Sequence, residues 1–492
     1  MKDLKQRTMR GGLAKVVAQI TNLVLRTGTL MIMARLLLPR DFGLVGMVTA
    51  VIGVFSVFRD FGLSAAAVQR SSISSDQSST LFWINLAVGG ALGVIAMALG
   101  PFVAAFYHEP RLIGVTAVLA TAFVFNAAGV QHSALLERQM RFVTLSVIDI
   151  VSLGSATSVG IVMALRGCGY WSLVATSTVT PLVYTLCCWI MTRWVPGRPR
   201  KQMEIFHMMR FGGTLTLNGL IMYFSMNLDK VLLGRFWGVD ALGIYGRAYQ
   251  LVSIPTDNLN SAAGGVVFAA LSRLQDEPSR LRNFFLKGYS LVLSLTVPIT
   301  LMCGLFGDDI IRVFLGHKWI SAIPIFRLLS PTTLGFAILA PLGWLLSACG
   351  LVGRGLRISM VIAPILIGSY FIGLHWGPLG VATAYSSAML LSVIPLIAWS
   401  RYGTPVLFSD LLLSIGRPLL AGLAAAGLGF AFRLLWGAMF HPLARLALAG
   451  LIVISIYAWI LLYVLRQKQL YVDIFRGFLK PPSTDDAVPV SA

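Results

Sequence analysis

Long apolar runs recur along nearly the whole chain and are separated by short polar connections. A helix needs about 20 apolar residues to cross the hydrocarbon core of a membrane, and these runs reach that length. They are continuous rather than alternating, which favours helices over the strands of a membrane barrel. The pattern therefore predicts an all-α polytopic membrane protein with about 14 transmembrane helices. The predicted runs are 14–38, 42–68, 80–106, 111–135, 143–165, 170–193, 211–236, 241–271, 286–306, 319–349, 356–375, 378–400, 411–436 and 443–465.

Two segments far apart in the chain are similar and predict an internal repeat. They are ARLLLPRDFGLVG at Ala34–Gly46 and GRFWGVDALGIYG at Gly234–Gly246. At an offset of 200 residues the matching positions are Arg35 with Arg235, Gly43 with Gly243, and Gly46 with Gly246. Both copies follow the start of an apolar run that begins on the same side of the membrane. This arrangement predicts two six-helix lobes related by an axis along the membrane normal, a parallel repeat, with two helices appended.

The repeat divides the chain into five predicted parts. These are an N-terminal lobe at 1–194, a basic cytoplasmic linker at 195–210, a C-terminal lobe at 211–402, two appended helices at 403–466 and a cytoplasmic tail at 467–492. The tail ends in PPSTDDAVPVSA, whose composition is typical of a partly disordered segment.

Composition and charge agree with a membrane protein. Hydrophobic residues make up 57% of the chain and charged residues 12%, with a mean hydropathy of +0.80. The net charge of +20 does not indicate a nucleic-acid partner, because with a cytoplasmic N-terminus most lysines and arginines fall in inner loops and helix ends. We therefore predict that both termini are cytoplasmic and that the basic inner surface attracts anionic membrane lipids.

Polar residues follow one face of the first predicted helix. The members of this stripe are Lys15, Gln19, Asn22, Arg26 and Thr29, at spacings of four and three residues. Such a stripe is costly against lipid and is expected to line the interior. The second, seventh and eighth predicted helices have similar faces, which contain Asp60, Asp229 and Asp257 respectively. We expect these faces to line a shared hydrated cavity.

Arginines dominate the charges inside the predicted helices. At a 1.5 Å rise per residue, Arg26 lies roughly 17 Å along its helix, near the middle of the bilayer. A guanidinium group suits phosphate oxygens better than it suits a metal ion, so the expected ligand is anionic. The predicted substrate-binding residues are Arg26, Arg59, Arg247, Arg327, Gln19 and Asn22. The alternative is that the charges form interhelical ion pairs, such as Arg59 with Asp60, or Asp149 with an arginine of another helix.

An acid and a base stand side by side in NLDKVLLGRF. Asp229 lies some 27 Å along the seventh predicted helix, near its outer end, and Lys230 points about 100° away around the same helix. Each is therefore expected to have a partner elsewhere. We predict a role in a gate or an exit path, with a static interhelical bridge as the alternative. The complete set of gate or ion-pair candidates is Asp60, Asp229, Lys230, Asp257 and Asp149.

Several chemistries are not supported by the sequence. The five cysteines include no CxxC pair, and the six histidines have no metal-ligand spacing. We predict no disulfide framework, no metal site and no cofactor. A membrane polymerase or ligase would be expected to have a sizeable external loop, and no GxSxG, HExxH or Gly-Lys-Ser/Thr motif occurs. The protein is therefore not expected to be an enzyme.

Several motifs together resemble one family of membrane proteins. They are ARLLLPRDFGLVGMV, RDFGLSAAAVQR, TLFWINLAVGG, LDKVLLGRFWGVDALGIYGRAYQLVSIP, SRLQDEPSRLRNFFLKGY and FLGHKWISAIPIFRLLSP. As a set they are similar to the polysaccharide transporter family of the multidrug/oligosaccharidyl-lipid/polysaccharide exporter superfamily, which includes the Wzx-type flippases. The resemblance covers about residues 1 to 350.

This resemblance implies a flippase of the bacterial inner membrane that translocates an undecaprenyl-pyrophosphate-linked oligosaccharide for lipopolysaccharide or exopolysaccharide assembly. It implies alternating access, a cationic cavity and an ion gradient as energy source. The implied partners are a lipid-linked oligosaccharide, membrane lipids, and polysaccharide polymerase and export machinery. The alternative is an ion-coupled multidrug or small-molecule antiporter of the same superfamily, although such a cavity should prefer acidic residues.

Overall fold

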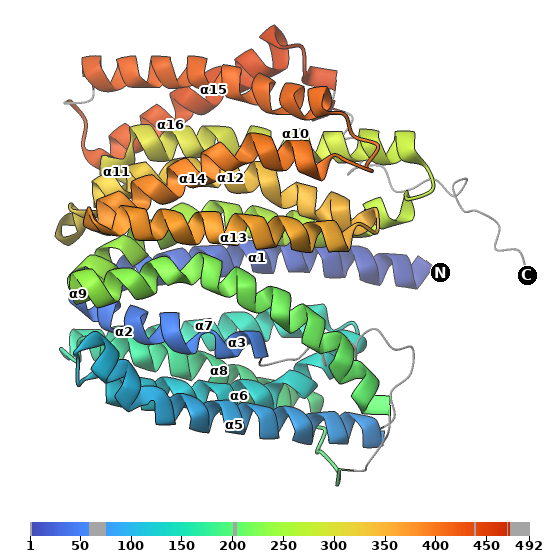
Figure 1. Cartoon of the computed structure of the whole chain (residues 1–492), viewed down its shortest axis with the longest axis vertical. Helices are drawn as coiled ribbons and strands as arrows, with labels where there is room; N and C mark the ends of the chain where they lie inside the picture. Colours follow the sequence, from blue (N-terminus) through green and yellow to red (C-terminus); the bar gives the residue numbers. More distant parts are fainter. Residues whose placement is uncertain (1, 59–74, 200–203, 437–438, 470, 473–492) are drawn as a thin grey trace, which may run out of the picture. The chain divides into compact units, whose positions relative to one another are not determined.

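The computed structural model describes residues 2–58, 75–199, 204–436, 439–469, 471 and 472. Helices and short connections account for these residues, and no strand occurs among them (Figure 1). Ten helices within these ranges are long and apolar enough to cross a membrane. The prediction of an all-helical, multi-pass membrane protein is thereby confirmed.

The helices have the following bounds in chain order. They are α1 (Lys2–Leu36), α2 (Pro39–Ile52), α3 (Phe55–Phe58), α5 (Ser75–Tyr107), α6 (Leu112–Arg138), α7 (Phe142–Leu165), α8 (Trp171–Thr192), α9 (Glu204–Arg273), α10 (Pro278–Leu305), α11 (Gly307–Phe314), η1 (His317–Trp319), α12 (Ala322–Ala348), α13 (Val352–Leu374), α14 (Gly377–Ser400), α15 (Phe408–Trp436) and α16 (Pro442–Trp459). A π-helical turn at Ile460–Val464 continues α16.

The predicted runs outside the ten apolar helices lie in α1, in α2 with α3, and in α9. The run 42–68 is described only as far as Phe58. The runs 211–236 and 241–271 both fall in α9, which is broken at Gly238 with φ 83° and ψ −174°. This backbone conformation is found almost exclusively at glycine. The segment therefore consists of two helices joined at one residue.

The short helix α11 is absent from the predicted pattern. Its eight residues are too few to span a membrane, and they begin with Gly307, Asp308 and Asp309, which have the composition of a polar connection. The short connection between the runs 286–306 and 319–349 therefore contains a helix that the apolar pattern did not predict. Sequence hydropathy detects spans, and a short polar helix carries no such signal.

The chain forms two compact units. Unit 1 takes in described residues of Met1–Ala248, Phe314–Ala322 and Ser359–Ala384, and unit 2 takes in those of Tyr249–Val313, Ile323–Ile358 and Tyr385–Ala492. Helices α9, α13 and α14 contribute to both units.

In unit 1 the helices pack in a connected series, α5 on α6, α6 on α8, α8 on α7 and α7 on α1. Met47 and Val48 of α2 enter the same buried core as Leu112 and Val115 of α6. Burial of such side chains supplies the main stabilisation between the helices. Large apolar side chains also remain on the surface of these helices, as faces toward lipid require; examples are Phe102, Leu165 and Ile190.

The two similar sequence segments meet inside unit 1. A Cβ atom on Gly43 would overlap the carbonyl oxygen of Val239, and a Cβ atom on Gly243 would overlap the carbonyl oxygen of Pro39. The backbones of α2 and α9 therefore cross in direct contact, which only residues without a side chain permit. We call these four residues the glycine crossing. Gly243 lies 200 residues after Gly43, and Val239 lies 200 residues after Pro39. The two contacts are therefore equivalent, with the repeated segments exchanged.

Helix α2 begins just before this crossing for local reasons. Pro39 occupies its first turn, where a missing N–H costs no helical hydrogen bond. The carboxylate of Asp41 accepts a hydrogen bond from the Leu38 N–H at 3.0 Å. The start of α2 is thus fixed within a few residues of Gly43.

In unit 2, α10 packs against α15 and contributes to two apolar cores. Phe285 and Leu293 of α10 lie in a buried core with Leu345 of α12. Val297 lies in a second core with Ala425 of α15 and Val453 of α16. Buried hydroxyl groups are hydrogen-bonded, as between Thr300 and Thr333 at 2.8 Å. These contacts place the last two helices against α10.

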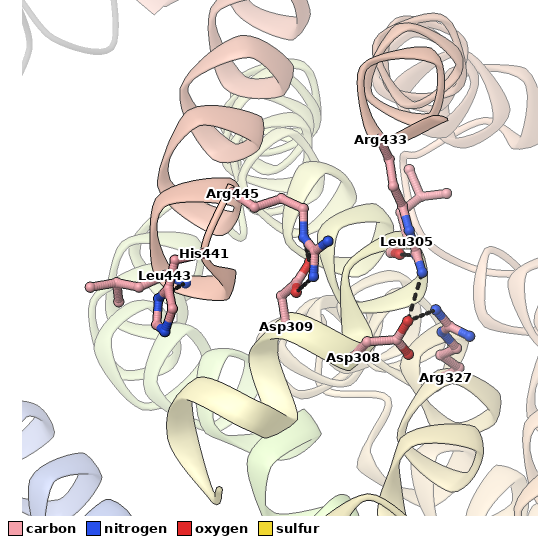
Figure 2. A network of polar contacts seen from close by, with 8 residues as sticks. All are labelled: Leu305, Asp308, Asp309, Arg327, Arg433, His441, Leu443 and Arg445. Atoms are coloured by element: carbon pink, nitrogen blue, oxygen red, sulfur yellow. Dashed lines mark hydrogen bonds and ion pairs between the residues drawn. The ribbon is translucent and has the colours of Figure 1, made fainter. Parts of the chain in front are cut away.

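Ion pairs tie α11 to three other helices of unit 2 (Figure 2). Asp308 forms an ion pair with Arg327 of α12 at 2.9 Å and accepts a hydrogen bond from Arg433 of α15 at 2.6 Å. Asp309 is bound by the Nε and Nη2 groups of Arg445 of α16. We call these five residues the α11 network. Asp308 thus holds the end of α15, and Asp309 holds the start of α16.

Alanine at Gly43 or Gly243 is expected to destabilise the fold, because the added methyl group meets backbone atoms that cannot move aside. We expect each substitution to lower the free energy of unfolding by about 2 kcal/mol. Matched controls are Gly46→Ala, whose Cβ would lie 3.5 Å from Leu242, and Gly246→Ala, which meets nothing within 4 Å. Thermal unfolding of the purified protein in detergent measures the effect. Equal unfolding temperatures for Gly43→Ala and Gly46→Ala would contradict the close crossing.

Removing the charge of Asp309 is expected to loosen α16. The Asp309 side chain is 1% exposed and that of Arg445 is 18% exposed, so Asp309→Asn leaves a largely buried cation without its carboxylate. The expected loss is about 3 kcal/mol of unfolding free energy. Glu277→Gln is the control, since its pair with Arg280 lies on the surface and should contribute little. Unfolding of Asp309→Asn at the temperature of that control would show that the pair does not hold α16.

Candidate functional site

The polar stripe of α1 is the first part of the candidate site in unit 1. Thr29, at its C-terminal end, makes a hydrogen bond at 2.8 Å with Thr157 of α7. Toward the N-terminus, Asn22 is half-buried, and Gln19 and Arg26 are exposed. The side chain of Lys15 is not among those described. The stripe thus extends from a helix contact to an open polar face.

Arg26 has an acidic neighbour on α7. The charge of Arg26 acts on Asp149, which is exposed on that helix. Among the described residues, no carboxylate lies within 4.0 Å of the Arg26 guanidinium group. The predicted ion pair of Asp149 is therefore not formed with Arg26, and the two charges attract one another at a longer distance.

Arg247 lies in a different environment within unit 1. Its guanidinium carbon is 4.4 Å from the centre of the Phe42 ring. The Phe42 ring in turn packs edge-on against Trp319, with ring centres 5.3 Å apart. The indole N–H of Trp319 donates to the carbonyl oxygen of Ala34 at 2.9 Å, which fixes the position of the ring. A cation over an aromatic face is stabilised without a counter-ion. No carboxylate of the described residues forms an ion pair with Arg247.

Asp229 and Lys230 have different side-chain partners, although the backbone N–H of Lys230 also contacts Asp229. The Asp229 carboxylate is 1% exposed and accepts hydrogen bonds from the Tyr245 hydroxyl at 2.8 Å and from the Lys230 backbone N–H at 2.8 Å. The ammonium group of Lys230 donates to the amide oxygen of Asn227 at 2.8 Å. These contacts resemble those of a structural network. A role in a gate stays a prediction.

The other predicted residues are distributed differently. Arg327 lies in unit 2, where its guanidinium group is bound to Asp308 in the α11 network (Figure 2). Asp257 lies in unit 2 and is exposed on α9. Arg59 and Asp60 lie outside the described residues. The structure thus brings Gln19, Asn22, Arg26 and Asp149 together on neighbouring helices, and it places Arg247 at the glycine crossing beside Phe42.

The sequence interpretation missed the aromatic support of Arg247. Phe42 belongs to the repeated motif, but its ring has no chemistry that marks it, and Trp319 is distant in sequence. The acidic pair in the sequence GDD was a usable signal for the α11 network. Of its arginine partners, Arg327 lies 19 residues later, but Arg433 and Arg445 lie 125 and 136 residues later.

Solved structures with a similar fold are membrane transporters. The lipid II flippase MurJ in an inward closed conformation matches with a TM-score of 0.73 at 14% identity, over 93% of this chain and 99% of that chain. A multidrug resistance MATE family transporter of the MOP superfamily, in an inward-facing conformation, matches with a TM-score of 0.63 at 14% identity, over 81% and 98%. At this identity the similarity concerns the fold alone.

Sequence relatives have names from polysaccharide assembly. The lipopolysaccharide biosynthesis protein WzxC of Escherichia coli (strain K12) is 26% identical over 399 residues, 80% of each chain. The teichuronic acid biosynthesis protein TuaB of Bacillus subtilis (strain 168) is 28% identical over 309 residues, 59% of this chain and 61% of the relative. The succinoglycan biosynthesis transport protein ExoT of Rhizobium meliloti (strain 1021) is 24% identical over 332 residues, 66% of each chain.

The family-level comparison covers more than half of the chain. Residues 32–324 match the sequence profile of the family described as polysaccharide biosynthesis protein. This range includes both copies of the repeated motif, Asp149 and Arg247, whereas Gln19, Asn22 and Arg26 precede it. The chain, a multi-pass membrane protein, therefore belongs to the polysaccharide biosynthesis protein family.

Proposed function

We propose that this protein is a flippase of the bacterial inner membrane for polysaccharide assembly. Its substrate is an oligosaccharide repeat unit linked to undecaprenyl pyrophosphate, and it moves this unit from the cytoplasmic to the periplasmic side. Family membership, relatives with names such as succinoglycan biosynthesis transport protein, and a fold similar to that of a lipid II flippase support the proposal. Polysaccharide polymerase and export machinery would use the product.

The observation that carries this proposal is Arg26. It lies in the predicted middle of the bilayer, on a polar helix face, and no described carboxylate pairs with it. A cation in that position is costly unless it serves a ligand. The forked N–H groups of arginine match the oxygens of a pyrophosphate, and Gln19 and Asn22 on the same face would supply additional hydrogen bonds. Arg247 and Arg59 are proposed as further cations on the path.

The same proposal includes the finer architecture. It has fourteen helices, six in each lobe at 1–194 and 211–402, with a linker at 195–210, and two further helices at 403–466. The reciprocal form of the glycine crossing and the break of α9 at Gly238 support it. Both termini, including the tail at 467–492, lie in the cytoplasm.

Alternating access gives the glycine crossing a role. On the proposed topology it joins the two lobes near the periplasmic surface of the inner membrane and closes the cavity on that side. Substrate release then requires α2 and α9 to separate there. Asp229 and Lys230 lie on α9, where Asp229 is bonded to Tyr245, two residues after Gly243, and they are proposed to restrain the opening of this crossing. Asp60, Asp149 and Asp257 remain candidates for the gate or for ion pairs.

Substitution of Arg26 is expected to impair export. Arg26→Ala removes the charge-assisted hydrogen bonds to the pyrophosphate, so export in a strain lacking the native gene should fall at least about tenfold at equal membrane abundance. Arg26→Lys keeps the charge without the fork and should have an intermediate effect. Arg280→Ala is the control, since this arginine is 70% exposed on the surface. The measurement is the amount of lipid-linked oligosaccharide on the cytoplasmic leaflet.

Full export by Arg26→Ala would remove this residue from the path. Normal lipid intermediates in a strain that lacks the gene and any redundant transporter would favour the antiporter, whose fold is also similar.

Covalent closure of the glycine crossing is expected to stop transport. A Cβ atom on Gly46 would lie 3.5 Å from Leu242 Cδ2, so a short bifunctional thiol cross-linker can join Gly46→Cys to Leu242→Cys in a chain without its five native cysteines. Cross-linking through mixed disulfides should abolish export, and reduction should restore it. The control joins Gly93→Cys to Val124→Cys, which are also in contact but lie within one proposed lobe. Undiminished export with the Gly46–Leu242 bridge intact would refute opening at this contact.

A further inference from the structure

Two arginines of unit 2 have buried N–H groups without hydrogen-bond acceptors. The atoms are Nη1 of Arg354, at the start of α13, and Nε of Arg401, directly after α14. A buried guanidinium N–H that has lost water and gained no acceptor costs free energy. Such groups in a native protein require an explanation. Because these two atoms are closed to solvent, a ligand would contact the outer N–H groups of the same forks, at Nη2 of Arg354 and at Nη1 and Nη2 of Arg401.

The two arginines converge on one loop. Gly403 follows Arg401 by two residues and has φ +67°, a conformation that disfavours side chains. A Cβ atom on Gly403 would lie 3.5 Å from Nη1 and 3.7 Å from Nη2 of Arg354. The Arg354 guanidinium group therefore lies against the backbone of the loop that carries Arg401. A residue with a side chain at position 403 would fill the space beside the Arg354 fork.

The position of Arg401 is set by aromatic rings. Its guanidinium carbon lies 5.0 Å from the centre of the Tyr402 ring and 5.8 Å from that of Phe408. Aromatic rings at these distances attract a cation but do not accept hydrogen bonds from its N–H groups. The group is thus oriented and remains able to donate hydrogen bonds.

The nearby carboxylate is already committed. Asp410 is bound through both oxygens to Arg282 of α10, at 2.7 and 2.8 Å. It also accepts the backbone N–H of Leu407 at 3.1 Å, at the start of α15. Among the described residues, neither Arg354 nor Arg401 forms an ion pair with any carboxylate. The loop therefore holds two positive charges that the described protein does not neutralise.

We propose that Arg354 and Arg401, with the backbone around Gly403, form a binding site for a phosphate group. Phosphate oxygens accept the forked N–H donors of arginine and neutralise both charges. On the topology proposed above, the α12–α13 and α14–α15 connections face the cytoplasm, where anionic headgroups are enriched. The source of the phosphate is a phospholipid headgroup or a soluble phosphate. The site is separate from Arg26, and its occupancy does not depend on a transported substrate.

Thermal unfolding of the full-length protein tests this site. The protein is purified in a phosphate-free glycoside detergent and titrated with phosphatidylglycerol, or with inorganic phosphate against chloride at equal ionic strength. Ligands that bind the folded state raise the unfolding temperature. We expect a rise that saturates with at least one probe. A rise with phosphatidylglycerol alone assigns the lipid headgroup, and a rise with both probes assigns a soluble phosphate.

Variants separate this site from general attraction of anions. Arg354→Gln with Arg401→Gln should weaken the binding of the effective probe at least about tenfold, the loss expected for a charge-assisted hydrogen bond. The charge-matched control is Arg357→Gln with Arg417→Gln, both exposed on α13 and α15, which should keep wild-type binding. Absence of a saturable rise in the wild-type protein would overturn the proposal even where a variant fails to fold. Equal weakening by both double variants would overturn it as well.

Discussion

The close approach of α2 and α9 at the glycine crossing determines the geometry of unit 1. Direct contact between two backbones leaves no room for adjustment, because carbonyl groups are held by their own helices. Tyr223 lies in the part of α9 before Gly238, and its hydroxyl donates to the carbonyl oxygen of Ala50 at 2.9 Å. Helix α2 therefore contacts both parts of α9. The approach brings Phe42 under the guanidinium group of Arg247. One steric condition at two glycines thus places the polar groups of both helices.

The two units treat their charges differently. In unit 2, acidic residues at helix ends are matched to arginines of other helices, in the α11 network and at Asp410. Such pairs fix the arrangement of helices because breaking one leaves an uncompensated charge. In unit 1, Arg26 and Arg247 have no ion-pair partner among the described residues, and the buried acid Asp229 is satisfied by Tyr245. Ion pairs between helices are thus described in unit 2, although Arg354 and Arg401 of the same unit also have no carboxylate partner among the described residues.

The sequence predicted helices well and their partners poorly. Apolar runs located the spans because the bilayer requires a fixed length of helix, whatever its neighbours. Spacing along α1 predicted the polar face with Arg26, since one helix determines it. Arg327 was read as an intramembrane cation available to substrate, and its contact with Asp308 could not be foreseen because it depends on tertiary packing. The match between Gly43 and Gly243 was visible in the sequence, but its meaning as a steric contact emerged only from the backbones.

The break at Gly238 allows the second part of α9 to turn relative to the first part. The direction of the helix that follows is determined by two dihedral angles at one residue, where a left-handed φ is tolerated only because no side chain is present. From there to Ala248, the last residue of α9 in unit 1, the helix extends about 15 Å, so a change of about 10° in its direction would displace that residue by about 3 Å. The glycine crossing holds Val239 and Gly243, within the first turn and a half after Gly238. A displacement of about one ångström at Gly243 is thereby geometrically equivalent to one about twice as large at Ala248.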